Sequence, residues 1–233
     1  FILDTRTYLI LFSITSLILL LGIIPLLLSK DIAIKRTNIT YKSCYNLIKN
    51  KKYKNTKNTF KYDGMNHILT VIIWPIILFI FLEKSFFKLG ALLTILSFIS
   101  IIIMFYIKKH IDKKNIEKYY KKTTNILSIT WFFKSILYLL GSFALFFIES
   151  VNKLTEYIYT ALFNSIFYNN IKNTDYFEYL LITEIYFRIS KIIFGLAIVI
   201  ILLFFGESMY TLSAIAFAGI FTSIGLGHYK QEN

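Results

Sequence analysis

The chain has 233 residues, of which 56% are hydrophobic, and its net charge at pH 7 is +13. A soluble domain of this length would not leave long apolar runs separated by short polar connectors, so the composition predicts an all-α, multi-pass membrane protein. The single cysteine, Cys44, excludes an internal disulfide framework. The positive charge lies mainly in connectors, which favours a role in membrane orientation over nucleic-acid binding.

Seven apolar stretches are long enough to be transmembrane helices, because a helix needs about 20 apolar residues to cross a hydrocarbon core about 30 Å thick. The fifth stretch is the most polar, since it contains Glu156, Asn164 and several tyrosines. In chain order the predicted helices are Tyr8–Ser29, Met65–Leu82, Phe86–Ile107, Asn125–Ile148, Leu154–Ile171, Phe177–Phe205 and Ser208–Gly227.

The basic residues predict the orientation of these helices, because loops rich in lysine and arginine stay in the cytoplasm. The connector after the first predicted helix and the connector after the third are rich in lysine, as in the run from Lys108 to Lys122. The intervening connectors contain only Lys84, Lys88 and Lys153. We therefore expect a cell (inner) membrane protein whose C-terminus is cytoplasmic.

The lengths of the connectors predict three parts. Residues 1–29 form one helix, residues 30–62 a basic cytoplasmic hinge, and residues 63–233 a six-helix bundle. Connections within a bundle usually have about 2–8 residues, so the hinge is expected to join two separate bundles. The first helix begins almost at Phe1, without an initiator methionine or a basic leader. We therefore expect further sequence, and a first bundle, upstream.

Three local patterns resemble the C-terminal half of a major facilitator superfamily transporter, preceded by the last helix of the N-terminal half. Residues 64–82 read GMNHILTVIIWPIILFIFL, with Trp74 and Pro75 in the middle of a predicted helix. The loop at residues 108–122 reads KKHIDKKNIEKYYKK, in which Asp112 and Lys113 match the facilitator loop motif. Lys108 stands where that motif has glycine, so the tight helix packing that the glycine gives is not expected here.

The third pattern is FEYLLITEIYFRISKIIFG at residues 177–195. Glu184 and Lys191 match the family in kind, whereas Thr183 and Ser190 depart from it. The resemblance implies two six-helix bundles that rock about a substrate site between them, so the expected partners are the lipid bilayer, the missing N-terminal half and an unidentified small solute. It also implies that Asp112 and Lys113 act as a conformational loop. Neither a cofactor nor a metal is expected.

Ionisable side chains inside a membrane helix are costly, which makes them candidates for the transport pathway. Lys134 lies about 14 Å along the predicted helix from Asn125, at 1.5 Å per residue. Trp131, Lys134 and Tyr138 share one face of that helix. This face predicts a pathway cation for an anionic substrate, and the alternative is a lysine that pairs within the bundle.

Two other groups of residues leave both a functional and a structural interpretation open. Glu184, Arg188 and Lys191 follow i, i+4 and i+7 spacing, which suits either a charge relay or a structural ion cluster. His67 is either a proton carrier or a hydrogen-bonded interfacial residue. Trp74 and Pro75 predict a helix kink, because proline removes a backbone donor.

Two other classes of protein compete with a transporter. Glu184 and Arg188 have part of the spacing of a motif from intramembrane proteases, but Thr183 replaces the second glutamate and the histidines lie near helix ends. Paired aspartates and Cys/His metal sets are missing from the sequence. An enzyme is therefore not the prediction, but a seven-span membrane enzyme such as an intramembrane protease stays an alternative. A membrane subunit without transport activity is the other alternative.

Overall fold

The computed structural model describes residues 48, 53–108, 115–206 and 208–230. They all belong to one compact unit, residues Ile39–Asn233. Every element in these ranges is a helix, which confirms the all-α prediction for this part of the chain. The elements are α3 (Lys54–Ile68), the π-helix η2 (Leu69–Ile73), α4 (Trp74–Phe81), α5 (Phe86–Lys108), α6 (Ile116–Ser135), α7 (Leu137–Asn173), α8 (Tyr176–Phe205) and α9 (Met209–Leu226).

Three predictions fall wholly or mostly outside the described residues. They are the first helix, Tyr8–Ser29, the conformational loop at Asp112 and Lys113, and the basic hinge at residues 30–62. Of the hinge, only residues 48 and 53–62 are described, and residues 54–62 already belong to helix α3.

Among the residues that the structure describes, three helices are long and apolar enough to cross a membrane. They are α8, α9 and the continuous stretch Lys54–Phe81 that joins α3, η2 and α4. Phe86–Ile102 of α5 forms a shorter apolar helix. Large apolar side chains cover their outer faces, and Leu203 and Phe204 of α8 expose 79% and 81% of their surface. Hydrocarbon solvates such a surface better than water does, so the structure supports a membrane-embedded protein.

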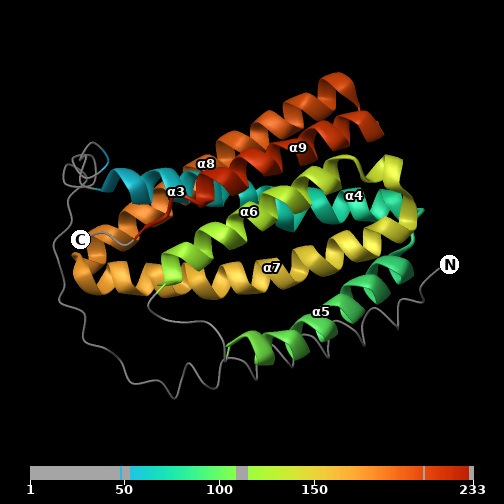
Figure 1. The fold of residues 1–233 in the computed structure, drawn as a ribbon. Coiled ribbons are helices and arrows are strands. Elements are labelled where there is room, and N and C mark those ends of the chain that lie inside the picture. The colour runs from blue at the N-terminus through green and yellow to red at the C-terminus, as the bar shows by residue number, and fades with distance from the viewer. Residues whose placement is uncertain (1–47, 49–52, 109–114, 207, 231–233) are drawn as a thin grey trace, which may run out of the picture. The chain divides into compact units, whose positions relative to one another are not determined.

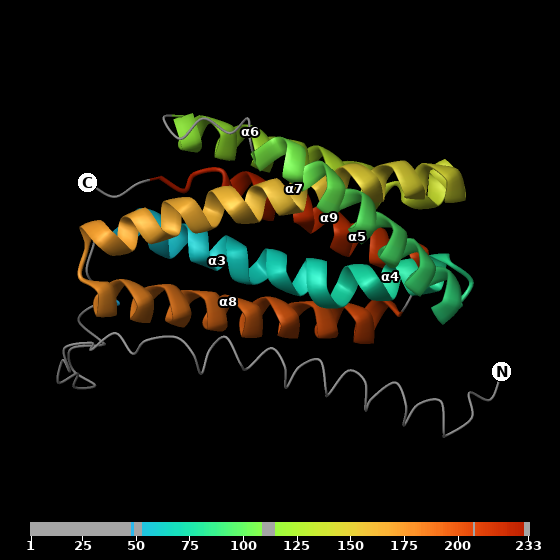
Figure 2. The same ribbon diagram turned by 90° about the horizontal axis from the view of Figure 1, so that it is seen from below.

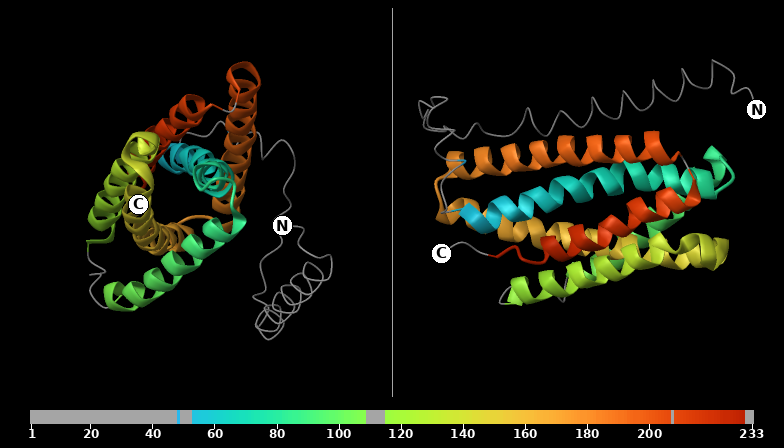
Figure 3. Two further views of the ribbon diagram at one scale, coloured as in Figure 1. Left: turned by 90° about the vertical axis from the view of Figure 1, so that its right-hand side faces the viewer. Right: turned by 90° about the horizontal axis from the view of Figure 1, so that it is seen from above.

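Successive helices run in alternate directions along a common axis (Figure 1). Helix α3 packs against α8 and α9, α6 packs against α7 and α9, and α5 packs against α7. In the view along the axes, α5 lies at the periphery beside α7 (Figure 3). The beginning of α3 and the ends of α7 and α9 lie at the same end of the bundle (Figure 2). A six-helix transmembrane bundle of the facilitator type at residues 63–233 stays a proposal.

The predicted helix Asn125–Ile148 is wrong in its boundaries. Helix α6 begins at Ile116 and ends at Ser135, and the chain turns at residues 136–141. Gly141 has φ +79° and ψ 175°, a conformation open to glycine but strained for other residues. The turn was hidden because its residues, Ile-Leu-Tyr-Leu-Leu-Gly, are almost all apolar. Helix α7 then includes the predicted helix Leu154–Ile171 and also Lys153, which is therefore not in a connector.

A π-helical turn precedes the Trp74-Pro75 pair. Pro75 lacks a backbone N–H, and its ring collides with the carbonyl four residues earlier in a regular α-helix. The π-turn at Leu69–Ile73 widens the backbone in that region. Thr70 of this turn directs its hydroxyl to the carbonyl oxygen of Asn66 at 2.9 Å. The sequence feature predicted as a kink therefore coincides with a change of helix type, and the bend itself stays a prediction.

Glycine permits close helix contacts at several places, and two of them bear on the site. A Cβ atom on Gly64 of α3 would lie 2.4 Å from the backbone oxygen of Phe187 in α8. A Cβ atom on Gly219 of α9 would lie 2.2 Å from the Cδ2 atom of Trp131 in α6. Small residues allow membrane helices to approach each other in this way. Gly219 therefore sets how closely α9 covers the region that contains the buried charges.

Candidate functional site

Lys134 and Glu149 form an ion pair in the interior of the bundle. The Nζ atom of Lys134 in α6 lies 3.1 Å from Oε1 of Glu149 in α7, and both side chains are 0% exposed. The indole Nε1 of Trp74 in α4 donates a hydrogen bond to the same oxygen at 2.8 Å. Because an isolated charge is costly in an apolar interior, each ion compensates the other. The pair thus ties three helices together at one point.

Two tryptophan rings enclose the ammonium group of Lys134. Its Nζ atom lies 4.3 Å from the ring centroid of Trp74 and 4.6 Å from that of Trp131. The two rings meet edge to face, with their centroids 5.9 Å apart. A cation over a tryptophan face gains about 2 kcal/mol when it is desolvated. The aromatic faces therefore replace part of the hydration that Lys134 loses on burial.

A polar cleft of about 280 Å³ lies on the other side of Trp131. Residues of α3, η2, α6 and α7 form its walls, and most of them carry a polar group. The lining consists of Asp63, Asn66, His67, Thr70, Val71, Leu127, Trp131, Lys153, Glu156, Tyr159 and Thr160. Trp131 thus lines the cleft and contacts the ammonium of Lys134, whereas Lys134 itself does not line the cleft.

A chain of hydrogen bonds runs along the α7 side of the cleft. Lys153 Nζ donates to Oε2 of Glu156 at 3.0 Å, and the Asn152 amide donates to Oε1 of Glu156 at 3.0 Å. Thr130 of α6 donates to Oδ1 of Asn152 at 3.2 Å. The Lys153 and Glu156 side chains are 28% and 26% exposed, so the cleft reaches this ion pair. Lys153 and Glu156 neutralise each other.

Asp63 brings a carboxylate to the cleft from the α3 side. The hydroxyl of Tyr159 in α7 donates to Oδ1 of Asp63 at 3.3 Å. Among the residues that the structure describes, no Lys, Arg or His nitrogen lies within 4.0 Å of this carboxylate. Asp63 is therefore held by a neutral donor and can respond to a charged group that enters the cleft.

His67 lies one helical turn from Asp63 and also lines the cleft. Its ring meets Phe187 of α8 edge to face, with 5.5 Å between centroids. The Nδ1 atom is buried and has no hydrogen-bond partner in the described part of the chain. The ring of His67 thus contacts Phe187 and also lines the polar cleft. Both interpretations of His67, as a proton carrier and as an interfacial residue, therefore stay open.

The structure brings together only some of the predicted pathway residues. Trp131, Lys134 and Trp74 meet around the buried ammonium group. Tyr138 does not join them, because α6 ends at Ser135 and the chain leaves the helix axis. Its ring, 40% exposed, packs edge to face against Tyr210 of α9, with 5.7 Å between centroids. The predicted common face is therefore wrong for Tyr138.

The charged residues of α8 lie outside the lining of the cleft. Nε of Arg188 pairs with Oε2 of Glu184 at 2.9 Å, and their side chains are 66% and 62% exposed. The ammonium of Lys191 lies 5.0 Å from the ring centroid of Phe187. Phe187 contacts both the Lys191 ammonium and the ring of His67. The arrangement fits the structural interpretation of Glu184, Arg188 and Lys191 as a local ion cluster.

Several residues of the site were missed by reasoning from the sequence. On α7, Glu149, Asn152, Lys153 and Glu156 follow i, i+3, i+4 and i+7 spacing, the pattern of one helix face. The pattern was overlooked because residues 149–153 fell between two predicted helices. Asp63 was overlooked for a similar reason, since the predicted helix began at Met65.

The arrangement suits binding of a small polar molecule, since one cleft presents a carboxylate, an ion pair, an imidazole and several hydroxyl and amide groups. In the described ranges no group of three or more His, Cys, Asp or Glu side chains is placed to hold a metal ion. Comparisons with protein-family models, with curated proteins and with solved structures found no match to this chain.

Proposed function

We propose that this chain is one lobe of a secondary active transporter of the major facilitator type, which moves a small polar solute by alternating access. The observation that supports the proposal is the polar cleft. Its ionisable residues Asp63, His67, Lys153 and Glu156 lie inside a bundle whose surface is apolar. Ionisable groups are rare in membrane helices and commonly mark a solute or ion pathway.

The second lobe of the proposed carrier covers the open side of the cleft. Val71, which lines the cleft, is 57% exposed, and Thr160 is also exposed. In transporters built from repeated bundles, the solute lies between the bundles near the middle of the membrane. The proposal therefore assigns one wall of the solute site to α3, η2 and α7. Location in the cell membrane and a cytoplasmic C-terminus belong to the same proposal.

The position of the α8 charges favours a carrier over a protease. A protease built on the Glu184 and Arg188 spacing would direct these residues towards a reaction centre. Instead they pair with each other on an exposed face, and neither lines the polar cleft. The polar groups that do meet in one cavity are suited to binding, and the cavity belongs to helices expected to move as a lobe.

Cysteine labelling tests the proposal without knowledge of the solute. Thr160→Cys is made in the whole protein after its natural cysteines, including Cys44, have been replaced by serine. The variant is treated with a charged, membrane-impermeant thiol reagent in right-side-out and in inside-out vesicles. A carrier exposes its cleft to each side in turn, so we expect labelling in both preparations.

The matched control is Ile192→Cys on α8, where the native side chain is 63% exposed. This position is more exposed than most of the cleft but faces hydrocarbon in the proposed arrangement, so the charged reagent should not reach it. Labelling of Thr160→Cys from one side only would contradict alternating access. The alternatives would then be a membrane enzyme or a membrane subunit without transport activity.

A further inference from the structure

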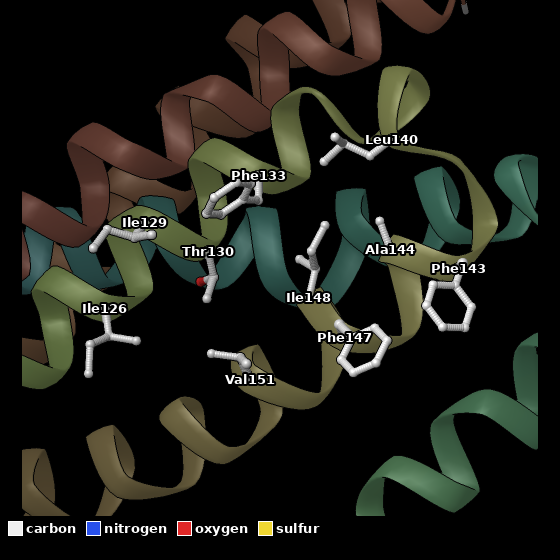
Figure 4. Close-up of a pocket in the computed structure, with 10 residues that line it drawn as sticks. All are labelled: Ile126, Ile129, Thr130, Phe133, Leu140, Phe143, Ala144, Phe147, Ile148 and Val151. Carbon is white, nitrogen blue, oxygen red and sulfur yellow. The ribbon is translucent and has the colours of Figure 1, made fainter.

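An apolar groove of about 510 Å³ lies between α6 and α7, on a different face from the polar cleft. Ile126, Ile129 and Phe133 of α6 form one wall, and residues of α7 from Phe143 to Val151 form the other (Figure 4). The lining is apolar apart from Thr130. That hydroxyl already donates to the carbonyl oxygen of Leu127 at 2.8 Å and to Oδ1 of Asn152 at 3.2 Å. The groove therefore offers its occupant only hydrocarbon contacts.

The α6 wall of the groove continues into a basic end. Lys122 precedes Ile126 by four residues, and Ile129 and Phe133 follow at three-residue and four-residue intervals, so these four side chains share one helix face. Lys118 lies one turn before Lys122 on the same face, and both lysines are exposed. Lys121 is also exposed but lies about 100° round the helix from Lys122.

The position of Lys118 does not stabilise α6 by itself. Helix α6 begins at Ile116, and a positive side chain in the first turn of a helix opposes the helix dipole. Lys122 lies one turn further along. The same end of a helix attracts anions. Lys118 and Lys122 therefore add positive charge where an anionic group would be favoured, at the end of a groove that accepts hydrocarbon.

We propose that this groove holds one acyl chain of an anionic phospholipid, whose phosphate is bound by Lys118 and Lys122. Basic residues at the membrane edge attract anionic head groups, and apolar grooves between helices accept lipid chains through van der Waals contacts. The lipid fills the space between α6 and α7. Thr130 and Asn152 separate it from the polar cleft, so the lipid site and the solute site are distinct.

Native mass spectrometry of the whole protein tests this assignment. The protein is titrated with phosphatidylglycerol and, separately, with phosphatidylcholine of the same acyl chains. We expect tighter binding of phosphatidylglycerol. The double variant Lys118→Gln/Lys122→Gln should weaken phosphatidylglycerol binding by about fivefold for each lysine and leave phosphatidylcholine binding unchanged.

Two further variants make the test specific. Lys121→Gln/Lys54→Gln removes the same charge from two exposed lysines at the same end of the bundle but off the groove face, and it should keep the preference for phosphatidylglycerol. Val151→Phe, at a half-exposed groove residue, should weaken the binding of both lipids by obstructing the groove. Equal affinity for the two lipids, or equal losses in the two lysine variants, would overturn the proposal whether or not the protein is a carrier.

Discussion

At the scale of single residues, the ammonium group of Lys134 is buried in the interior of the bundle beside the polar cleft. Lys134 belongs to the last turn of α6. Its ammonium group contacts two other helices, through the ion pair with Glu149 of α7 and the ring of Trp74 of α4. The second carboxylate oxygen of Glu149, Oε2, is buried and has no hydrogen-bond partner among the described residues. The charges are therefore only partly compensated. A buried pair of this kind is a weak source of net stability, although loss of either partner alone is damaging.

A double-mutant cycle at this pair follows from that asymmetry. Lys134→Met leaves Glu149 charged and without its cation, so we expect a loss of about 3–5 kcal/mol in the free energy of unfolding. Lys134→Met combined with Glu149→Gln removes both charges and keeps an oxygen that can accept from Trp74, so most of the loss should be recovered. Unfolding followed by tryptophan fluorescence in detergent measures both. A double variant as unstable as Lys134→Met would show that the charges themselves are needed.

The sequence predicted part of this site for a clear physical reason. A lysine in an apolar run stands out, and the 3–4 residue spacing places Trp131 beside it, so Lys134 and Trp131 could be found without a structure. Glu149 could not be paired with Lys134 in the same way, because the two residues meet only if the chain reverses between them. The reversal at residues 136–141 carries no polar turn signal, and Gly141 alone marks it.

At the scale of elements, the reversal between α6 and α7 brings Lys134 and Glu149 together and places the two walls of the apolar groove side by side. Gly141 adopts φ +79° and ψ 175° there, and a Cβ atom at this position would meet no other atom within 4 Å. The requirement for glycine is thus one of backbone conformation and not of space. The boundaries of α6 and α7 depend on this one residue more than on any hydrophobic pattern.

Alanine substitutions at two glycines separate conformation from packing. Gly141→Ala should destabilise the protein by about 1–3 kcal/mol, because alanine is strained in this region of backbone space. Gly90→Ala is the control, since Gly90 lies within α5 and its Cβ would also meet nothing within 4 Å. There alanine should stabilise by about 0.5–1 kcal/mol through its helix propensity. Denaturant unfolding of the two variants should give changes of opposite sign, and equal signs would contradict the assigned turn.

At the scale of the whole molecule, the alternation of helix direction sorts the connectors into two groups. Residues 82–85 and 136–141 lie at one end of the bundle, and the end with the start of α6 and the end of α7 carries most lysines of the described ranges (Figure 1). Lys153 lies within α7 and not in a connector. The end of the bundle with fewer lysines therefore has one basic residue fewer than the sequence predicted, which strengthens the asymmetry. The corrected helix boundaries therefore favour the same orientation as the original prediction.

Sided labelling checks that orientation. Lys84→Cys and Lys172→Cys replace exposed residues at opposite ends of the bundle. With an impermeant thiol reagent, Lys84→Cys should react only in right-side-out vesicles and Lys172→Cys only in inside-out vesicles, because lysine-rich segments remain in the cytoplasm. The reverse result would show that the protein has the opposite orientation in the membrane. Labelling of both variants from the same side would contradict the alternating helix directions.

Trp131 contacts the ammonium of Lys134 and also lines the polar cleft, and Trp74 lies against it. These are the only two tryptophans of the chain. All of its indole emission therefore arises from one location, beside the proposed solute. Indole emission from this lobe therefore reports on a single microenvironment, so in the proposed carrier it is a built-in optical probe of cleft occupancy that needs no attached dye.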